Sequence, residues 1–168
     1  MSHPSISIVV LIASLAAGAT ASAQRATLTI SGRVLPGTCT LSAPAIKLDP
    51  VKASDLVTGD NALLAGALQF TGCIGVTKAT LSFDGTPADG DPIRWKNTAS
   101  SDAATGVSVA LRAGASTGDY LKHGDSDVLV ITGSTGSYPL RAGYYLAGTG
   151  GINAGQVQAD VIVTAAYE

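Results

Sequence analysis

The chain has 168 residues, the length of a single domain, with 13% charged residues and a formal net charge of −2. This balance leaves no surplus of cations to neutralise phosphates, so the composition argues against nucleic-acid binding. Two cysteines and two histidines are too few for a zinc finger or an iron–sulfur cluster, and neither a metal nor another cofactor is expected. The apolar content of 46% is too high for a disordered chain.

The first 23 residues are predicted to be a signal peptide. Residues 5–19 form an uncharged apolar run, which is short for a membrane span of about 20 residues. Ala21-Ser22-Ala23 follows as a small-x-small cleavage site. The segment before the run contains no Lys or Arg, which leaves an uncleaved anchor as the alternative. We expect cleavage after Ala23 and a mature chain that begins at Gln24.

Export would place Cys39 and Cys73 in an oxidising compartment, where we expect them to form a disulfide. The sequence between them would form a closed loop, and a loop of this length stabilises a fold by roughly 3–4 kcal/mol in the chain-entropy model. A metal site or a thiol-redox site is the weaker interpretation, because the spacing is not C-x-x-C and no histidine accompanies the cysteines.

The mature chain shows the alternating patterns of short β-strands. The predicted strands cover residues 27–34, 64–70, 79–83, 106–112, 128–131, 138–145 and 157–167. A single helical turn is expected near Ser54–Leu56. The segments 84–105 and 113–127 are rich in Gly, Ala, Ser, Thr and Asp, and we expect solvated connections there. This pattern predicts an all-β, antiparallel sandwich of one domain.

Few residues could carry chemistry. His123 lies in a polar turn, where an exposed loop residue is far more common than a catalytic base. Asp84, Asp89 and Asp91 could bind calcium weakly, but they are more typical of solvated turns. Trp95 could stack on a sugar or pack at a strand edge. We therefore expect that the protein is not an enzyme.

The two ends of the mature chain do not fit a complete sandwich. The N-terminus begins as a strand almost at once. Its apolar and small positions, at i, i+2 spacing, are Leu28, Ile30, Gly32 and Val34. The last predicted strand runs to Tyr167 with an apolar stripe and nothing after it to cover its flank. Because an unpaired apolar edge can accept a strand from another chain, we predict a fold that is one strand short and is completed by β-strand addition.

Several segments between Gln24 and Glu168 resemble a known family. They are Thr27–Val34 with Cys39 following, Phe70-Thr71-Gly72-Cys73, Thr105–Leu111, Leu140–Tyr145 and the C-terminal strand. The C-terminal strand is the most specific, because Gly155 is fourteenth from the end and Tyr167 is penultimate, with alternating apolar residues between them. In this order, and behind a signal peptide, the segments resemble a subunit of the chaperone–usher pili, the type 1 and P fimbrial subunits, closest in style to the short-armed minor or tip subunits.

The resemblance implies an incomplete immunoglobulin-like sandwich at residues 38–168, which lacks its last strand and follows an N-terminal donor-strand extension at residues 24–37. A periplasmic chaperone would donate a strand to the open groove, and at the outer-membrane usher the extension of the next subunit would replace it. The protein would be a structural subunit of an adhesive surface pilus, exported through the periplasm to a cell-surface fimbrium. Its expected partners are other pilus subunits, identical or different, together with the chaperone and the usher, and its loops could contact a host receptor.

The resemblance also implies roles for particular residues. The donor strand would point Leu28, Ile30, Gly32 and Val34 inward, with Gly32 where the groove is too shallow for a side chain. The strand that borders the groove and pairs with the chaperone would carry Gly155, Val157, Ala159, Val161, Val163 and Tyr167. The terminal carboxylate of Glu168 would be held by basic residues of the chaperone. The disulfide between Cys39 and Cys73 would join the first two strands.

Some features leave alternatives open. Four residues precede Leu28 in the mature chain, so the donor arm is short, and the sequence does not distinguish a major from a minor subunit. Gly32 could mark an ordinary bulge, and Tyr167 could be a core aromatic residue of an edge strand. A secreted single-domain lectin or adhesin with a complete sandwich is the alternative function.

Overall fold

The computed structural model describes residues 27–116, 118–148 and 150–168, so the predicted signal peptide and its cleavage site lie outside the described residues. The chain divides into two units, of which the first ends at Arg33 and the second is a body that extends from Val34 to Glu168. In the described ranges, no helix has the length and apolar character needed to cross a membrane.

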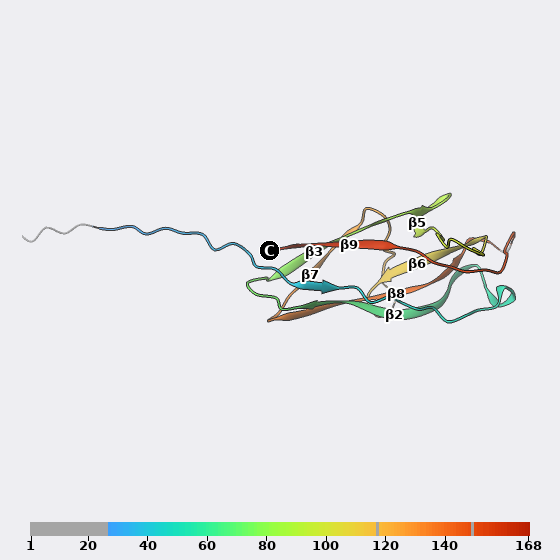
Figure 1. The fold of residues 1–168 in the computed structure, drawn as a ribbon, viewed down its shortest axis with the longest axis horizontal. Coiled ribbons are helices and arrows are strands. Elements are labelled where there is room, and N and C mark those ends of the chain that lie inside the picture. Colours follow the sequence, from blue (N-terminus) through green and yellow to red (C-terminus); the bar gives the residue numbers. More distant parts are fainter. Residues whose placement is uncertain (1–26, 117, 149) are drawn as a thin grey trace, which may run out of the picture. The chain divides into compact units, whose positions relative to one another are not determined.

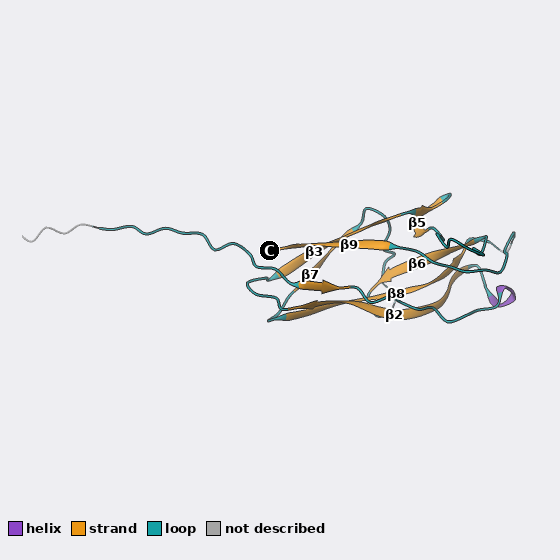
Figure 2. Cartoon of the chain, in the orientation of Figure 1, coloured by secondary structure: helices purple, strands orange, loops and turns teal. Residues whose placement is uncertain are grey.

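The body is built from two antiparallel β-sheets (Figure 1 and Figure 2). The six-stranded sheet has the order β1-β2-β8-β6-β5-β4, and the three-stranded sheet has the order β7-β3-β9. The strands are β1 (Thr40–Ser42), β2 (Gly59–Thr71), β3 (Lys78–Gly85), β4 (Pro87–Ala88), β5 (Asp91–Trp95), β6 (Val107–Ala113), β7 (Ser126–Val130), β8 (Thr135–Leu146) and β9 (Val161–Tyr167). A 3-10 turn at Ala53–Asp55 lies where the sequence predicted a helical turn.

Alternate residues of the long strands point between the sheets, where most of them form the main core and Val107 and Leu146 belong to a second, smaller cluster. On β3 the inward residues are Ala79, Leu81 and Phe83, which are almost completely buried. The facing strands β6 and β8 add residues such as Leu111 and Leu140 to the main core. Burial of a large apolar side chain contributes roughly 1.5–3 kcal/mol, so this period-2 pattern is the main reason that these segments form strands.

The prediction that 84–105 is a solvated connection is wrong. This segment contains the hairpin β4–β5, and Trp95 at its end has no exposed surface. The indole N–H of Trp95 donates a hydrogen bond to the carbonyl of Leu121 over 2.9 Å. Leu121 is itself buried within the second predicted connection, 113–127. The two large apolar side chains draw both segments onto the core despite their polar composition.

The outer face of the six-stranded sheet carries a stack of cationic and aromatic side chains. The guanidinium of Arg94 lies 3.5 Å from the ring centroid of Tyr120 and 3.8 Å from that of Tyr145. Arg112 covers Tyr120 at 3.7 Å and donates a hydrogen bond from Nε to Asp60 over 2.6 Å. Cation–π contacts of this kind are worth roughly 0.5–2 kcal/mol each, and here they hold β5 and the segment around Tyr120 on the sheet.

Candidate functional site: an open groove beside the last strand

The strand β9 lies at one end of the three-stranded sheet, next to β3 alone among the described strands. The short strand β1 likewise lies at one end of the six-stranded sheet. Each sheet therefore has an edge whose backbone groups are free to pair with a further strand.

The free edge of β9 carries the backbone groups of its odd-numbered residues. Lys78 and Glu168 exchange two backbone hydrogen bonds, of 3.2 and 3.0 Å. Antiparallel pairs alternate between hydrogen-bonded and non-bonded positions, so the register of β3 and β9 turns the N–H and C=O groups of even residues toward β3. The corresponding groups of odd residues, from Val161 to Tyr167, face the free edge.

The free edge continues before the strand begins. Gln156 and Gln158 form backbone hydrogen bonds with the segment 98–104, whereas Val157 and Ala159 form none with the described residues. The same alternation thus extends from Val157 to Tyr167. At about 3.3 Å per residue this edge is roughly 35 Å long, enough for a donor strand of about ten residues.

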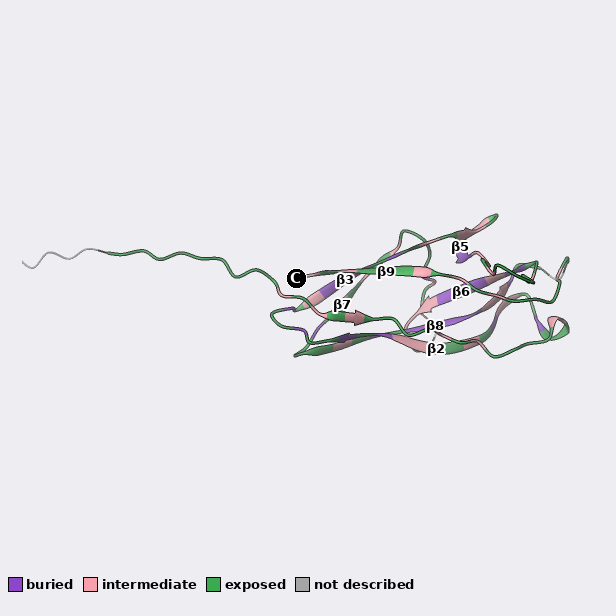
Figure 3. Ribbon diagram, viewed as in Figure 1, coloured by how far each residue is buried: buried purple, intermediate pink, exposed green. Residues whose placement is uncertain are grey.

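Side chains at the same odd positions point into the molecule. They are half-buried and pack against the core, while their even-numbered neighbours are exposed, as the alternating colours of β9 in Figure 3 show. These half-buried residues are Val157, Ala159, Val161, Val163, Ala165 and Tyr167. The structure therefore places the odd-numbered residues singled out in the sequence in one line. Gly155 precedes this line and is exposed.

A groove of about 720 Å³ opens along this line. Its walls are the segment 43–48 on one side and residues 157–163 on the other. Its floor consists of apolar residues from both sheets, which include Leu68, Phe83, Val109, Leu111, Leu140 and Ala142. An apolar groove with a free strand edge on one wall can accept an extended peptide, whose backbone would pair with the edge and whose alternate side chains would fill the groove.

The opposite wall also has unpaired backbone. Residues 43–48 follow β1 without forming any backbone–backbone hydrogen bond to the described residues. Ile46 and Leu48 pack on the core, and the hydroxyl of Tyr144 donates to the carbonyl of Asp49 over 3.0 Å. Side-chain packing rather than a hydrogen-bond ladder holds this wall in place, so an inserted strand could pair with it as well.

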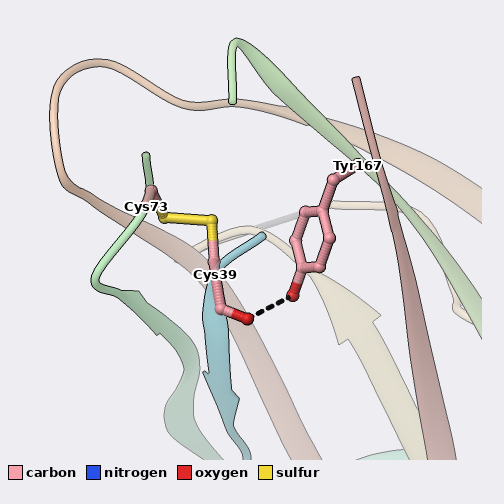
Figure 4. Close-up of a disulfide and its surroundings, with 3 residues drawn as sticks. All are labelled: Cys39, Cys73 and Tyr167. Atoms are coloured by element: carbon pink, nitrogen blue, oxygen red, sulfur yellow. Dashed lines mark hydrogen bonds between the residues drawn. A yellow bond between two sulfur atoms is a disulfide. The ribbon is translucent and has the colours of Figure 1, made fainter. Parts of the chain in front are cut away.

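The predicted disulfide between Cys39 and Cys73 is present (Figure 4). It joins the residue before β1 to the segment after β2, as expected for the first two strands. The hydroxyl of Tyr167 donates a hydrogen bond to the carbonyl of Cys39 over 3.1 Å. The carbonyl of Glu168 accepts from the N–H groups of Thr77 and Lys78, and the Glu168 side chain pairs with Lys78 Nζ at 2.9 Å. These contacts anchor β9 beyond the Val163 end of the groove.

Residues 27–34 do not form a strand in the single chain, so that prediction is wrong for the isolated subunit. Leu28, Ile30 and Val34 are 83%, 86% and 97% exposed. A lone segment has no partner for its backbone and no surface against which to bury its side chains, so its alternation cannot produce a strand by itself.

The other candidate residues do not line the groove. His123 is exposed, with Nδ1 2.9 Å from Oδ1 of Asp84. No group of three His, Cys, Asp or Glu side chains in the described ranges could hold a metal ion. The full burial of Trp95 contradicts the interpretation that it stacks on a sugar.

Sequence reasoning missed the floor of the groove and the wall at 43–48. The alternation of Ile46 and Leu48 was the signal that could have revealed this wall. It is short and follows Pro44, which masks the strand-like pattern. The floor residues came from predicted strands, but only their assembly shows that they line a groove.

One family model matches most of the chain. The family model described as "Fimbrial protein" matches residues 28–168. No curated protein sequence matches the chain. The fold is similar to that of the P pilus rod subunit PapA, with a TM-score of 0.64, 14% identity, and coverage of 79% of this chain and 100% of that chain.

Two further solved structures are similar. The Burkholderia pseudomallei antigen and type I fimbria protein BPSL1626 has a TM-score of 0.59 and 21% identity, over 79% of this chain and 91% of that chain. A chain in the structure of a chaperone–usher pilus has a TM-score of 0.64 and 15% identity, over 86% of this chain and 96% of that chain. Identities at this level show that the folds agree.

Proposed function

Since this chain belongs to the fimbrial protein family, we propose that the groove between residues 43–48 and β9 is the site that accepts a strand from another chain. The chain is a structural subunit of a chaperone–usher pilus, and it passes through the periplasm to a fimbrium on the cell surface. Its partners are other pilus subunits and a chaperone, in keeping with similar structures of a P pilus adaptor subunit and of a chaperone–tip adhesion subunit complex. The groove serves binding, and we propose no catalytic role.

The observation that carries the proposal is that the free edge runs beside the apolar groove. In the odd-numbered residues from Val157 to Tyr167, the backbone N–H and C=O groups face the free edge, and the side chains point into the molecule. A strand that binds there would satisfy the edge and cover the floor in one step. The chaperone strand and the donor arm of the next subunit would occupy this site in turn, with the exchange taking place at the usher.

The donor arm in this proposal is residues 24–37. Burial of Leu28, Ile30 and Val34 in a neighbouring groove would contribute roughly 1.5–3 kcal/mol each. A new ladder would add about 0.5–1.5 kcal/mol net for each hydrogen bond. Together these terms reach the roughly 12 kcal/mol of a nanomolar complex without a covalent link. Gly32 would pass the part of the groove that is too shallow for a side chain.

The test is to fill the groove within one chain. Residues 24–37 are added after Glu168 through a short turn, which lets the added segment run antiparallel to β9. We expect a monomer with a higher urea midpoint than the unmodified mature chain, which should be unstable or polymeric. In a matched control, serine replaces the added copies of Leu28, Ile30 and Val34. Equal stability of all three proteins, with full amide protection of residues 155–167 in the unmodified monomer, would show that no strand is missing.

A further inference from the structure

The free edge that ends at Tyr167 is called the acceptor edge below, because a donor strand would bind there. We infer that Asn97 is a positioning residue that holds residues 156–160, the first part of this edge, in the register that the donor strand requires. The inference rests on the proposed function, because it concerns the site where the donor binds. It assigns a role in strand exchange to a loop that does not line the groove.

The first part of the acceptor edge has no neighbouring strand. The pairing of β3 with β9 begins at Gly85 and Val161, so residues 156–160 lie beyond the end of the ladder. Val157 and Ala159 nevertheless line the groove. Something other than β3 must keep this segment extended and turned the correct way.

The side chain of Asn97 takes the place of the missing strand. Its Nδ2 group donates hydrogen bonds to the carbonyls of Ala104 and Gln156, over 3.0 and 2.9 Å. Its Oδ1 atom accepts hydrogen bonds from the N–H groups of Ala99 and Gln158, over 3.2 and 3.0 Å. An amide side chain offers two donor hydrogens and two acceptor lone pairs, so every site on Asn97 is used. Two of the four bonds hold the acceptor edge, and the other two hold the loop from which Asn97 projects.

Backbone groups of the same loop also bind this segment, and together with the Asn97 side chain they form what we call the clamp. The N–H of Thr98 donates to the carbonyl of Gln158 over 2.8 Å, and the N–H of Gln156 donates to the carbonyl of Asp102 over 2.6 Å. Gly155 lies so close to the Asp102 carbonyl that a Cβ atom on it would overlap that oxygen. The absence of a side chain at Gly155 therefore allows the edge to approach the loop.

The clamp fixes which residues face the groove. All of its bonds to the edge use the even-numbered residues Gln156 and Gln158, so the backbone and side chains of Val157 and Ala159 are left for the groove. A shift of one residue would turn the apolar side chains outward and the glutamines inward. Loss of the clamp should thus weaken donor binding at this part of the groove, while leaving the part that lies along β9 unchanged.

The test compares three synthetic peptides with the arm sequences 24–37, 24–31 and 30–37. Each is added to a chain that begins at residue 38, which keeps the compact body but lacks the arm that would compete with the peptides or join subunits, and binding is followed by NMR titration. Whichever direction the donor runs, one short peptide lies along β9 and the other along residues 157–160. For Asn97→Ala we expect affinity for the long peptide and for one short peptide to fall roughly tenfold, which corresponds to one or two lost hydrogen bonds. The other short peptide should bind as before. Asn153→Ala, which removes an exposed amide from another loop, is the matched control.

Equal losses for both short peptides would mean that Asn97 stabilises the whole body, and no loss for either would mean that it does not position the edge; both results overturn the inference. Asn97→Asp, which is nearly isosteric and sets a carboxylate against two carbonyls, gives a second variant if Asn97→Ala folds poorly.

Hydrogen exchange separates this inference from the proposed function. In unliganded Asn97→Ala, the amides of Gln156 and Gln158 should exchange faster, and those of Thr164 and Ala166 should keep their rates. Unchanged exchange at Gln156 and Gln158 would contradict the clamp. If no arm peptide bound to the wild-type chain, the proposed donor would fail, while the exchange rates would still decide whether Asn97 holds the edge.

Discussion

The hydroxyl of Tyr167 and the backbone carbonyl of Cys39 form a hydrogen bond of 3.1 Å that joins the last strand of one sheet to the start of the first strand of the other (Figure 4). The disulfide from Cys39 to Cys73 continues this connection to the segment after β2. The two walls of the groove are therefore tied together beyond one end, while the groove itself stays open. This arrangement explains how a body without a strand between its walls can keep them at a set spacing.

The first prediction concerns the hydrogen bond from the Tyr167 hydroxyl to the Cys39 carbonyl. Tyr167→Phe keeps the ring but leaves the Cys39 carbonyl without its donor, so the free energy of unfolding should fall by about 1 kcal/mol in urea titration. Tyr145→Phe is the matched control, because the Tyr145 hydroxyl takes part in none of the hydrogen bonds found in the described residues. The same small change in both variants would contradict a structural role for the Tyr167 hydroxyl.

The second prediction concerns the empty space of the groove. Ala159→Leu places additional methylene groups where the groove has room, so the unliganded body should become more stable by about 1 kcal/mol. The same side chain occupies space that a donor needs, and affinity for the 24–37 peptide should fall at least tenfold. Thr164→Leu, on the exposed face of β9, should change neither quantity in this way. Tighter peptide binding by Ala159→Leu would show that the donor does not lie there.

The third prediction concerns the donor arm. A 24–37 peptide with Gly32→Val adds a side chain at the position expected to pass the shallow part of the groove. Overpacking of this kind costs roughly 1–3 kcal/mol, so affinity should fall about 10- to 100-fold in calorimetric titration. In the control peptide, Ser31→Val places the same side chain on the outward face. If both peptides bind alike, Gly32 is no more than a bend in the arm.

The fourth prediction concerns alkaline pH. Burial and the hydrogen bond of 2.6 Å from the Tyr138 hydroxyl to Asp127 raise the pKa of Tyr138 well above the usual value of about 10. Because the folded-state pKa is raised, the stability that this group contributes is fully present below about pH 10 and is lost as the pH rises toward the folded-state pKa. For the oxidised protein, the free energy of unfolding should fall by up to about 1.4 kcal/mol per pH unit for this group above pH 10.

Tyr138→Phe should flatten that dependence in urea titrations between pH 8 and pH 11. Some slope should remain, because burial also raises the pKa of Tyr120 and that of Tyr144. Tyr145→Phe serves as the control once more. A slope in Tyr138→Phe as steep as that of the wild-type chain would mean that other groups account for the alkaline loss.

Sequence patterns predicted most of the strands because those segments bury every second side chain. The alternation in β3 and β6 is regular, and the structure confirms both strands within a few residues. The hairpin β4–β5 was missed because its sequence is polar and rich in turn residues. It forms because the ring of Trp95 fits the core and finds a carbonyl partner on Leu121, and no local pattern contains that information.

Side-chain periodicity and composition were enough to predict the incomplete sandwich, the cysteine pair and the line of odd-numbered residues that ends at Tyr167. The second wall at residues 43–48 and the hydrogen bonds from Asn97 to Gln156 and Gln158 became visible only in the folded chain. Both depend on contacts between segments far apart in the chain. Such contacts are set by how the sheets pack and where one ladder ends, and neither leaves a periodic trace in the local sequence.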